Sequence, residues 1–519
     1  MNKRIRILCL ILALVMVLPM LFACGDGEEE ETKKPTGPAI SNKEDPLAEF
    51  AKDLDFGGEE IVINLSKYTN DQITTESLQF IQGPDKTTTD TVLNKIYNRN
   101  NHVSDSIGVE ARYVYTNLAY NQIMPDIQQK VVTPGKDTPD LYIDQLYGIS
   151  RAQMAGYLLN VLSEHETSHI NFDEGGWYND YMKAFNLHSD EKLYLLAGDY
   201  TMDVIRFLNL MSCNLSLFQE LFYKDGGDDL LYDAVTDGEW SYDLLMEWSE
   251  VAYRDTPGTD PGPDKNDQLG LFTSYHGGQG PIAMGWLPSA NVSLFDVSAQ
   301  GKFSVPATHE RAFNVIEKLI KVLHHTTGVY VPQGTDADSA TTDARTAFVN
   351  GTSLFTTGVL LYMMETSEYQ NMEDEKCVLP YPKYDPKTDD YYVTTHDCAR
   401  VGGVLKVTQK FEETSAWLQA MALTSTDVLD EYYNAALKFK YGSNADTTKI
   451  LDIIYDSICA PYWYAPINDA STNFTSPLDS FTALGSETNN FTSNYASVKG
   501  ILQSNLEDYV SRFNALQDQ

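Results

Sequence analysis

The chain has 519 residues, of which 74 are acidic and 37 are basic, and its formal net charge is −37 with a pI near 4.4. This charge argues against nucleic acid as a partner, because binding to phosphate requires clustered lysine and arginine. The acidity instead favours solubility on an outer cell surface.

The first 23 residues have the pattern of an export signal. The basic residues at its start are Lys3, Arg4 and Arg6. The apolar run that follows, 7–22, is too short for a permanent membrane helix and predicts a signal peptide over residues 1–23. Cys24 follows the small residue Ala23 and resembles the lipidated Cys of a bacterial lipobox, whose acyl chains anchor a protein to the membrane. An ordinary cleaved signal with an unmodified Cys24 is the alternative.

Residues 24–56 are acidic at first and then rich in Thr, Pro, Gly, Lys and Asn. Such a composition offers little surface to bury, so we expect a flexible linker. The folded part, 57–519, has about 460 residues, more than one hydrophobic core usually supports. The length therefore predicts two lobes or domains.

Strand and helix patterns alternate after the linker. In chain order they are a strand at 60–65, a helix at 91–103, a strand at 108–115, a helix at 120–131, a strand at 139–144 and a helix to about 157. This alternation predicts an α/β layer with a largely parallel sheet. Helices dominate from about residue 204, with the expected ranges 213–223, 240–253, 308–324, 341–349, 411–460 and 494–517. Short strands are expected at 376–379 and 403–407.

Loss of the signal and lipidation of Cys24 would leave four cysteines: Cys213, Cys377, Cys398 and Cys459. Their spacing fits neither C-x-x-C nor a zinc ribbon. A bridge between Cys377 and Cys398 would staple the segment between them. Reduced and buried cysteines are the alternative.

Residues 165–169 read His-Glu-Thr-Ser-His and match the H-E-x-x-H pattern of zinc peptidases. In those enzymes the two histidines lie on one helix face and bind zinc, and the glutamate activates water. Here Thr167 and Ser168 are weak helix formers and Gly175-Gly176 follows, so we expect a polar loop. A zinc metallopeptidase acting through His165, Glu166 and His169 stays an alternative.

The aspartates between 255 and 267 resemble a degraded calcium loop. Asp260, Asp264 and Asp267 fit positions 5, 9 and 12 of an EF-hand, but Pro261 replaces the turn glycine. An acidic surface loop is the expected reading, and no metal or cofactor is expected in this chain.

Several segments taken in order carry a family resemblance. Beside the lipobox they are 61–65, 140–143, 156–162, 192–200, 232–241, 347–355, 379–383 and 402–407. Together they resemble an extracellular solute-binding lipoprotein of a bacterial ATP-driven (ABC) importer, nearest the carbohydrate-type, family 1-like group. The number and the order of the matches carry the resemblance, which covers nearly the whole chain.

The resemblance implies an α/β fold of the periplasmic-binding-protein type (type II), with two α/β lobes joined by hinge crossovers and a ligand cleft between them. Lobe 1 would comprise 57–203 plus 399–440, and lobe 2 would comprise 204–398 plus 441–519. Closure of the hinge would bury the ligand between the lobes. The chain lacks a Walker A loop, so ATP hydrolysis and membrane passage would belong to separate permease subunits.

The resemblance also places ligand contacts at the ends of early strands and in two later segments. The residues to which it points are Tyr68, Asp144, Gln145, Trp286 and Tyr362. Carboxylate and amide groups bind sugar hydroxyls, and aromatic rings stack on the apolar faces of sugars. Trp286 is the expected stacking residue. Packing in the core is the alternative for each aromatic residue.

The expected protein is thus a monomeric, non-enzymatic receptor, lipid-anchored on the extracellular face of the cell membrane. It would deliver a sugar or oligosaccharide to the ABC permease. A receptor for another solute, such as a peptide, is the alternative within the same fold. A glycosidase is disfavoured by the resemblance, although the many acidic residues provide numerous carboxylate pairs.

Overall fold

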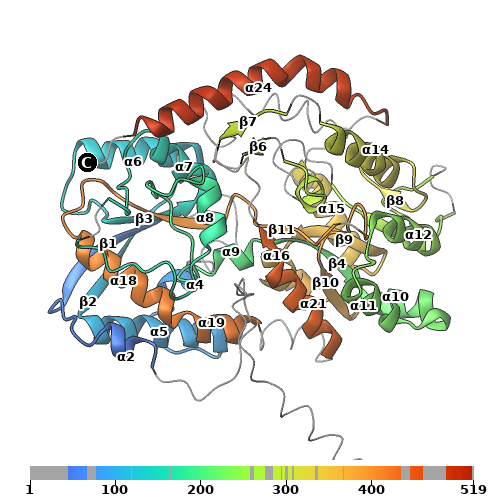
Figure 1. Cartoon of the computed structure of the whole chain (residues 1–519). Helices are drawn as coiled ribbons and strands as arrows, with labels where there is room; N and C mark the ends of the chain where they lie inside the picture. The colour runs from blue at the N-terminus through green and yellow to red at the C-terminus, as the bar shows by residue number, and fades with distance from the viewer. Residues whose placement is uncertain are drawn as a thin grey trace, which may run out of the picture. The chain divides into compact units, whose positions relative to one another are not determined.

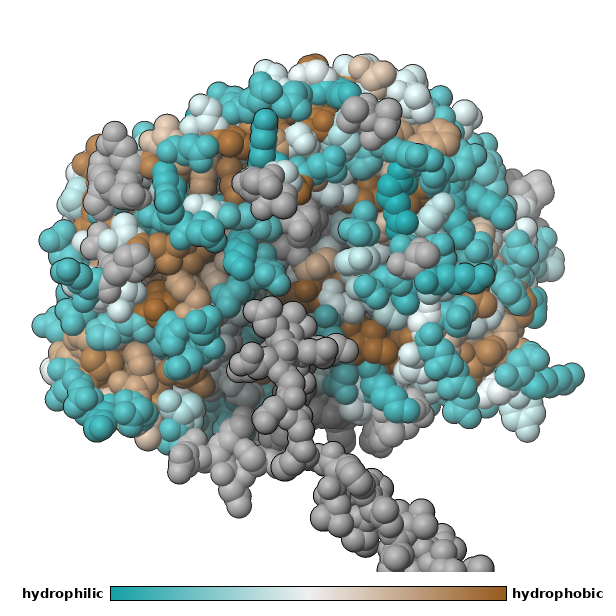
Figure 2. Space-filling view, in the orientation of Figure 1, coloured by the Kyte–Doolittle hydropathy of each residue, from teal (hydrophilic) through white to brown (hydrophobic). Residues whose placement is uncertain are grey.

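A computed structural model of the chain describes residues 45–66, 78–118, 120–163, 166–257, 262–274, 285–293, 295–298, 302–306, 309–332, 337–365, 367–387, 389–433, 445–459 and 487–516. The signal peptide, Cys24 and most of the predicted linker lie outside these ranges. Residues 41–519 form one unit. None of the helices within the described ranges is both long and apolar enough to cross a membrane. On the face shown in Figure 2, hydrophilic side chains are interspersed with smaller hydrophobic patches.

The first sheet has four strands in the order β12-β3-β1-β2 (Figure 1). β1 (Glu59–Ser66) pairs in parallel with β2 (Val109–Thr116) and β3 (Leu141–Gln145). β12 (Arg400–Val404) is antiparallel to β3. The last six residues of β1 and all five of β3 are buried, as expected for strands covered on both faces. The sequence predicts β1, β2 and β3 to within two residues at each end.

Helices surround this first sheet. They are α2 (Leu47–Phe50), α4 (Gln79–Gln82), α5 (Thr91–Ile107), η2 (Tyr120–Gln122), α6 (Ile123–Val132), α7 (Leu146–Met154), α8 (Asn179–Phe185), α18 (Phe411–Thr424) and α19 (Thr426–Asp430). Asp90 caps the N-terminus of α5: its side chain accepts a hydrogen bond from the Leu93 amide at 3.0 Å. It ends at Gly108, whose φ of 69° favours glycine. α18 packs on α5 and β1, so a late segment completes the first layer.

The second sheet has five strands in the order β10-β4-β9-β5-β8. These strands are β4 (Asn209–Asn214), β5 (Leu269–Phe272), β8 (Val329–Tyr330), β9 (Ser353–Val359) and β10 (Lys376–Leu379). β4 is antiparallel to both of its neighbours, whereas β5 is parallel to β8 and β9. The strand at 376–379 is confirmed, but the sequence analysis misses β4, β5 and β9, where it expects mainly helices.

Among the described helices of this second part, those at 215–222, 242–252, 310–324, 337–349 and 445–456 correspond to expected ranges, whereas those at 228–236, 287–289, 360–365 and 367–370 are not predicted. The helices are α10 (Leu215–Phe222), η3 (Tyr223–Asp225), α11 (Asp228–Thr236), α12 (Tyr242–Ala252), α13 (Leu287–Ser289), α14 (Glu310–His324), α15 (Ala337–Val349), α16 (Leu360–Glu365), α17 (Ser367–Gln370) and α21 (Ala445–Asp456). Two short pairs accompany them, β6 (Asp296–Val297) with β7 (Phe303–Ser304) and β11 (Val393–Thr394) with β13 (Ile458–Cys459). The core is rich in aromatic rings: Trp240 stacks on Trp248 at 5.4 Å between centroids and lies 5.5 Å from Phe355 of β9. These contacts fix α12 to the sheet.

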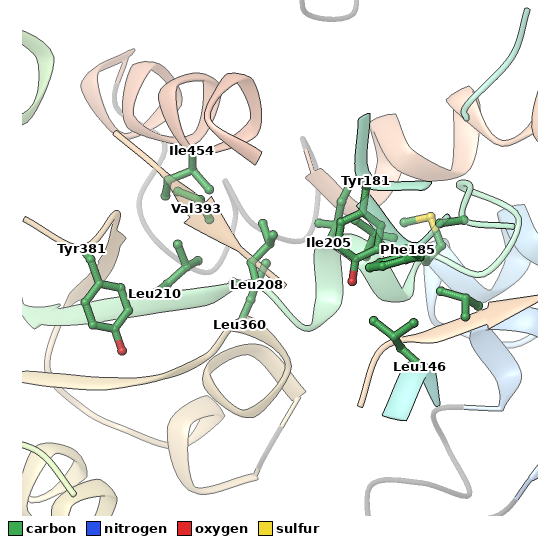
Figure 3. Close-up of a cluster of buried hydrophobic side chains, with 14 of the residues drawn as sticks. Leu146, Tyr181, Phe185, Ile205, Leu208, Leu210, Leu360, Tyr381, Val393 and Ile454 are labelled. Carbon is green, nitrogen blue, oxygen red and sulfur yellow. The ribbon is translucent and has the colours of Figure 1, made fainter. Parts of the chain in front are cut away.

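Two neighbouring chain segments connect the sheets. The outgoing one contains α9 (Asp203–Arg206) and leads into β4, and the returning one joins β11 to β12. Leu208 and Thr395 form an antiparallel bridge between them. Buried apolar side chains continue across the connection, with Ile205 beside Tyr181 and Phe185 on one side and Leu208 beside Leu360 on the other (Figure 3). The lobe boundaries remain a prediction, and the boundary expected between 440 and 441 lies outside the described residues.

The last helix, α24 (Phe491–Asn514), contacts both halves (Figure 1). Near its start it packs on α14, and near its middle the Gln503 side chain accepts a hydrogen bond from the Val305 amide at 3.1 Å. At its end, Lys192 Nζ donates to the carbonyl oxygens of Asn514 at 3.0 Å and Leu516 at 2.5 Å. The contacts of this segment therefore extend beyond the second lobe, to which the sequence analysis assigns it.

Candidate functional site

Asp144 and Gln145 end β3 at its carboxyl end. Asp144 is fully buried and Gln145 is only 5% exposed. Asp144 Oδ1 accepts a hydrogen bond from the Gln145 amide at 2.7 Å. Asp144 Oδ2 and Gln145 Oε1 have no hydrogen-bond partner among the residues that the structure describes. Because a buried polar atom without a partner costs about 1–3 kcal/mol, these two oxygens are suited to accept hydrogen bonds from a bound molecule.

Polar side chains from the two neighbouring strands lie close to this point. Ser66, the last residue of β1, lies close enough to the Asp144 carboxylate to act against the rise in its pKa. Its hydroxyl is also 2.9 Å from the Thr116 hydroxyl at the end of β2. The carboxyl ends of parallel strands are where open α/β sheets usually bind ligands. Three adjacent strands thus present hydroxyl and carboxylate groups at the edge that commonly forms a site.

The environment of Asp144 alters its acidity. Burial raises the pKa of Asp144 to about 6, although Ser66, the Gln145 amide and the positive charge of Arg400 act in the opposite direction. The carboxyl group therefore changes its charge close to neutral pH, unlike an exposed aspartate.

A buried ionic cluster joins the two crossovers beside this site. Asp203 Oδ1 is 2.8 Å from Arg206 Nη1, and Asp203 Oδ2 is 3.0 Å from Arg400 Nη1. All three side chains are at most 2% exposed. Arg400 lies opposite Gln145 in the ladder between β12 and β3. The sequence analysis misses this cluster: it places a lobe boundary between 203 and 204, but nothing in one sequence pairs Asp203 with an arginine almost 200 positions later.

Trp286, the predicted stacking residue, is fully buried in the second half of the molecule. Its ring lies 5.0 Å from the Tyr381 ring and 5.7 Å from the Tyr242 ring, both edge-on. The Tyr242 hydroxyl donates a hydrogen bond to the Trp286 carbonyl oxygen at 3.0 Å. In this structure Trp286 therefore packs as a core residue, which is the alternative given above, and stacking on a ligand stays a prediction.

The two predicted tyrosines cannot be placed against Asp144. Tyr68 lies outside the described residues, two positions after the end of β1. Tyr362 belongs to α16, directly after β9, but its side chain lies outside the description. Asp144 and Gln145 are the predicted site residues that the structure brings together.

The H-E-x-x-H segment does not form a zinc-peptidase helix in its described part. Residues 166–169 are a turn followed by irregular backbone, and His165 lies outside the described residues. The His169 ring is 3.6 Å from the Glu412 carboxylate and packs edge-on against Phe50 and Phe56. The described residues 166–169 therefore lack the helical geometry that a zinc-peptidase motif requires.

The aspartate loop is organised by internal hydrogen bonds. Asp267 is fully buried, and its carboxylate accepts hydrogen bonds from the amides of Thr256 at 2.8 Å and Asp264 at 2.9 Å. These bonds occupy oxygens that a calcium ion would need. Asp260 and Pro261, the other residues of the resemblance to a calcium loop, lie outside the described residues.

The four cysteines within the described residues, Cys213, Cys377, Cys398 and Cys459, are free thiols in the structure. Cys213 and Cys377 lie directly opposite each other on β4 and β10. Burial and this neighbour raise the pKa of Cys213. The predicted bridge between Cys377 and Cys398 is therefore absent here, and the reduced alternative applies.

Two α/β sheets linked by paired crossovers define the periplasmic-binding-protein fold, and the comparison with solved structures supports this assignment. The galacto-N-biose-/lacto-N-biose I-binding protein of the ABC transporter from Bifidobacterium longum matches with a TM-score of 0.53 at 12% identity, covering 88% of this chain and 99% of that protein. At this identity the likeness concerns the fold.

Further matches have lower scores. The GacH receptor of Streptomyces glaucescens matches at 10% identity with a TM-score of 0.48, covering 89% of this chain and 100% of that protein. The ABC substrate-binding protein Lmo0181 from Listeria monocytogenes matches at 13% identity with a TM-score of 0.48, covering 88% of this chain and 99% of that protein. No protein-family model and no curated protein matches the sequence.

Proposed function

We propose that this chain is the extracellular receptor of an ABC importer and captures a sugar or oligosaccharide. The main supporting observation is the pair of buried oxygens, Asp144 Oδ2 and Gln145 Oε1, without partners in the described structure. Sugar hydroxyls would donate hydrogen bonds to both oxygens, and the side-chain NH₂ group of Gln145 would donate a hydrogen bond to a sugar oxygen. The fold, which is that of a sugar-binding protein of an ABC transporter, gives independent support.

Capture would proceed by closure of two lobes around the ligand. The segments around α9 and between β11 and β12 would act as the hinge, and contacts from both lobes would favour the closed state. Tyr68, Trp286 and Tyr362 are the aromatic residues that we propose for contact with the sugar. Contact by Trp286 would require rearrangement of the ring cluster with Tyr242 and Tyr381.

The place of the protein in the cell follows from the N-terminal sequence. Lipidation of Cys24 would hold the receptor on the extracellular face of the membrane, beside the permease subunits to which it delivers its ligand. The acidic linker would let the folded part of the monomer move some distance from its membrane anchor. The net charge of −37 supports the exclusion of nucleic acid as a partner.

A thermal-shift screen tests the proposal. The unit 41–519 is mixed with a panel of mono- and oligosaccharides and, separately, with a panel of peptides. A sugar present at 100 times its dissociation constant is expected to stabilise the protein by about 2.7 kcal/mol, which raises the melting temperature. A rise with peptides and with no sugar would assign the alternative solute class.

The ligand recovered from the complex distinguishes a receptor from an enzyme. A receptor returns its sugar unchanged, so mass spectrometry of the released ligand is expected to show the intact molecule. Recovery of shorter sugars would indicate glycosidase activity instead.

Binding is expected to weaken below about pH 6, where Asp144 becomes protonated. Its carboxylate accepts hydrogen bonds from sugar hydroxyls, whereas the protonated form has lost one acceptor position and its charge. Folding should respond in the opposite direction. Because the folded-state pKa is raised, ionisation of Asp144 destabilises the ligand-free protein as the pH rises through 6.

Titration calorimetry across this pH range, on wild type and Asp144→Asn, measures the effect with the best sugar from the screen. The pH dependence should be smaller in the variant. Equal dependence in both proteins would assign it to another group, for which Asp199 is a candidate because burial also raises its pKa to about 6.

A further inference from the structure

Three consecutive residues in the returning crossover, His396, Asp397 and Cys398, gather three different metal-binding groups. One nitrogen of the imidazole, one carboxylate oxygen and the Cys398 sulfur all lie within 4.8 Å of one another. The residues form the turn between β11 and β12. This turn is far in sequence from the H-E-x-x-H segment and from the aspartate loop.

Hydrogen bonds with the outgoing crossover and with α7 hold the backbone of the turn. The His396 amide donates to the carbonyl oxygen of Phe207, on the outgoing crossover, at 2.8 Å. The Tyr147 amide, in α7, donates to the carbonyl oxygen of Asp397 at 3.1 Å. The three side chains therefore project from a fixed frame, which lowers the entropy cost of organising them around an ion.

His396 Nδ1 has two close contacts within the turn. It accepts a hydrogen bond from the Cys398 amide at 3.1 Å, and it is 3.0 Å from Asp397 Oδ1. Because Nδ1 has one lone pair, a metal ion would bind through Nε2 or would replace the hydrogen bond from the Cys398 amide. The imidazole and the carboxylate already lie side by side in the turn.

We propose that His396, Asp397 and Cys398 bind a divalent transition-metal ion of the zinc type. Thiolate, imidazole and carboxylate are all ligands of Zn²⁺, and the two anionic groups balance its charge. The nitrogen and sulfur donors favour such an ion over Mg²⁺ and Ca²⁺, which prefer oxygen. Three protein ligands leave the fourth position of a tetrahedral site open to water.

The site has a route for entry of the ion. The His396 side chain is 28% exposed and Cys398 is partly exposed, whereas the Asp397 side chain is 6% exposed. The ion can therefore approach from solvent on the side of His396 and Cys398, and the carboxylate binds from the protein interior. Because the turn belongs to the connection between the sheets, bound metal should also stabilise this connection.

Zinc titration of the full-length protein in detergent tests the site. After reduction and removal of metal by a chelator, the wild type is expected to take up about one equivalent of Zn²⁺, measured by elemental analysis after gel filtration. Competition with a chromophoric chelator gives the affinity, which Cys398→Ser and His396→Gln should lower by at least about tenfold. Excess Mg²⁺ and Ca²⁺ should not displace the zinc.

Two matched variants separate this site from other donors. Cys459→Ser removes another partly exposed thiol, and His169→Gln removes a histidine of the H-E-x-x-H segment; both should bind zinc as the wild type does. Absence of uptake by the wild type, or equal affinity in Cys398→Ser and the wild type, overturns the proposal. Either result would be expected if His396 carries a proton that pairs with Asp397 and no metal ion binds.

A measurement on unaltered protein covers the case in which a variant fails to fold. Zn²⁺ is expected to protect Cys398, but not Cys459, from alkylation, and mass spectrometry of the digested protein identifies the modified thiol. Equal alkylation of Cys398 with and without zinc would also contradict the site.

Discussion

Replacement of Asp203 by alanine is expected to lower the free energy of unfolding by about 3–5 kcal/mol, because it removes the buried carboxylate that pairs with two buried arginines. Asp203 accepts hydrogen bonds from Arg206 and Arg400, and no member of the cluster is more than 2% exposed. Arg206 also lies over the Phe80 ring at 3.9 Å, so the cluster is enclosed on this side. Urea unfolding followed by circular dichroism measures the loss.

Asp508→Ala is the matched control for this prediction. Asp508 is 2.9 Å from Arg512 on α24, but its side chain is 62% exposed. Water screens such a pair, so its removal is expected to cost less than about 1 kcal/mol. Similar losses for Asp203→Ala and Asp508→Ala would show that the buried cluster does not stabilise the crossovers. Substitution of all three charged residues by apolar ones of similar size should restore much of the stability.

Asp144→Ala is expected to weaken sugar binding by about 10- to 100-fold, which corresponds to the loss of one or more hydrogen bonds to a charged group. The variant should nevertheless be at least as stable as the wild type without ligand, because burial of the ionised carboxylate is unfavourable. Loss of affinity combined with unchanged or greater stability is the signature of a residue that serves the ligand. Calorimetry with the best sugar and a melting curve measure the two quantities.

Asp140 provides the control at the opposite end of the same strand. Its carboxylate accepts hydrogen bonds from the Val62 amide at 2.9 Å and the Thr408 hydroxyl at 2.6 Å, so it supports the sheet. Asp140→Ala should lower the melting temperature and leave the affinity of the folded protein unchanged. Unchanged sugar affinity in Asp144→Ala would remove Asp144 from the proposed site.

The first sheet could be predicted because its strands are continuous apolar runs between clear helix patterns. β1, for example, contains Ile61, Val62 and Ile63 and is bounded by Gly57-Gly58. The strands in the middle of the second sheet could not be predicted from the sequence. β4 reads Asn-Leu-Met-Ser-Cys-Asn and is completely buried, although half of its residues are polar. Neither an alternating nor a continuous apolar pattern identifies it, and it is stable only because neighbouring strands pair on both sides.

Part of the candidate site could also be predicted from the sequence and part could not. Asp144 and Gln145 lie at the end of a recognisable strand, so their position at its carboxyl end could be predicted. Arg400 approaches Gln145 only through pairing between β3 and β12, which are separated by more than 250 positions. Trp286 shows the opposite difficulty: its residue type suits stacking on sugars, but ring contacts inside the fold bury it.

If the two halves separate as the proposed capture requires, α24 would limit how far they can move apart. One end of the helix is fixed near α14, and the other is held by Lys192, close to Leu196, which pairs with Gly402 of β12. A swing of one sheet away from the other must therefore detach one end of the helix or bend it. A fluorescent label or affinity tag attached close after Leu516 would lie next to the contacts with Lys192, so a sensor based on this protein should carry the label in an internal surface loop instead.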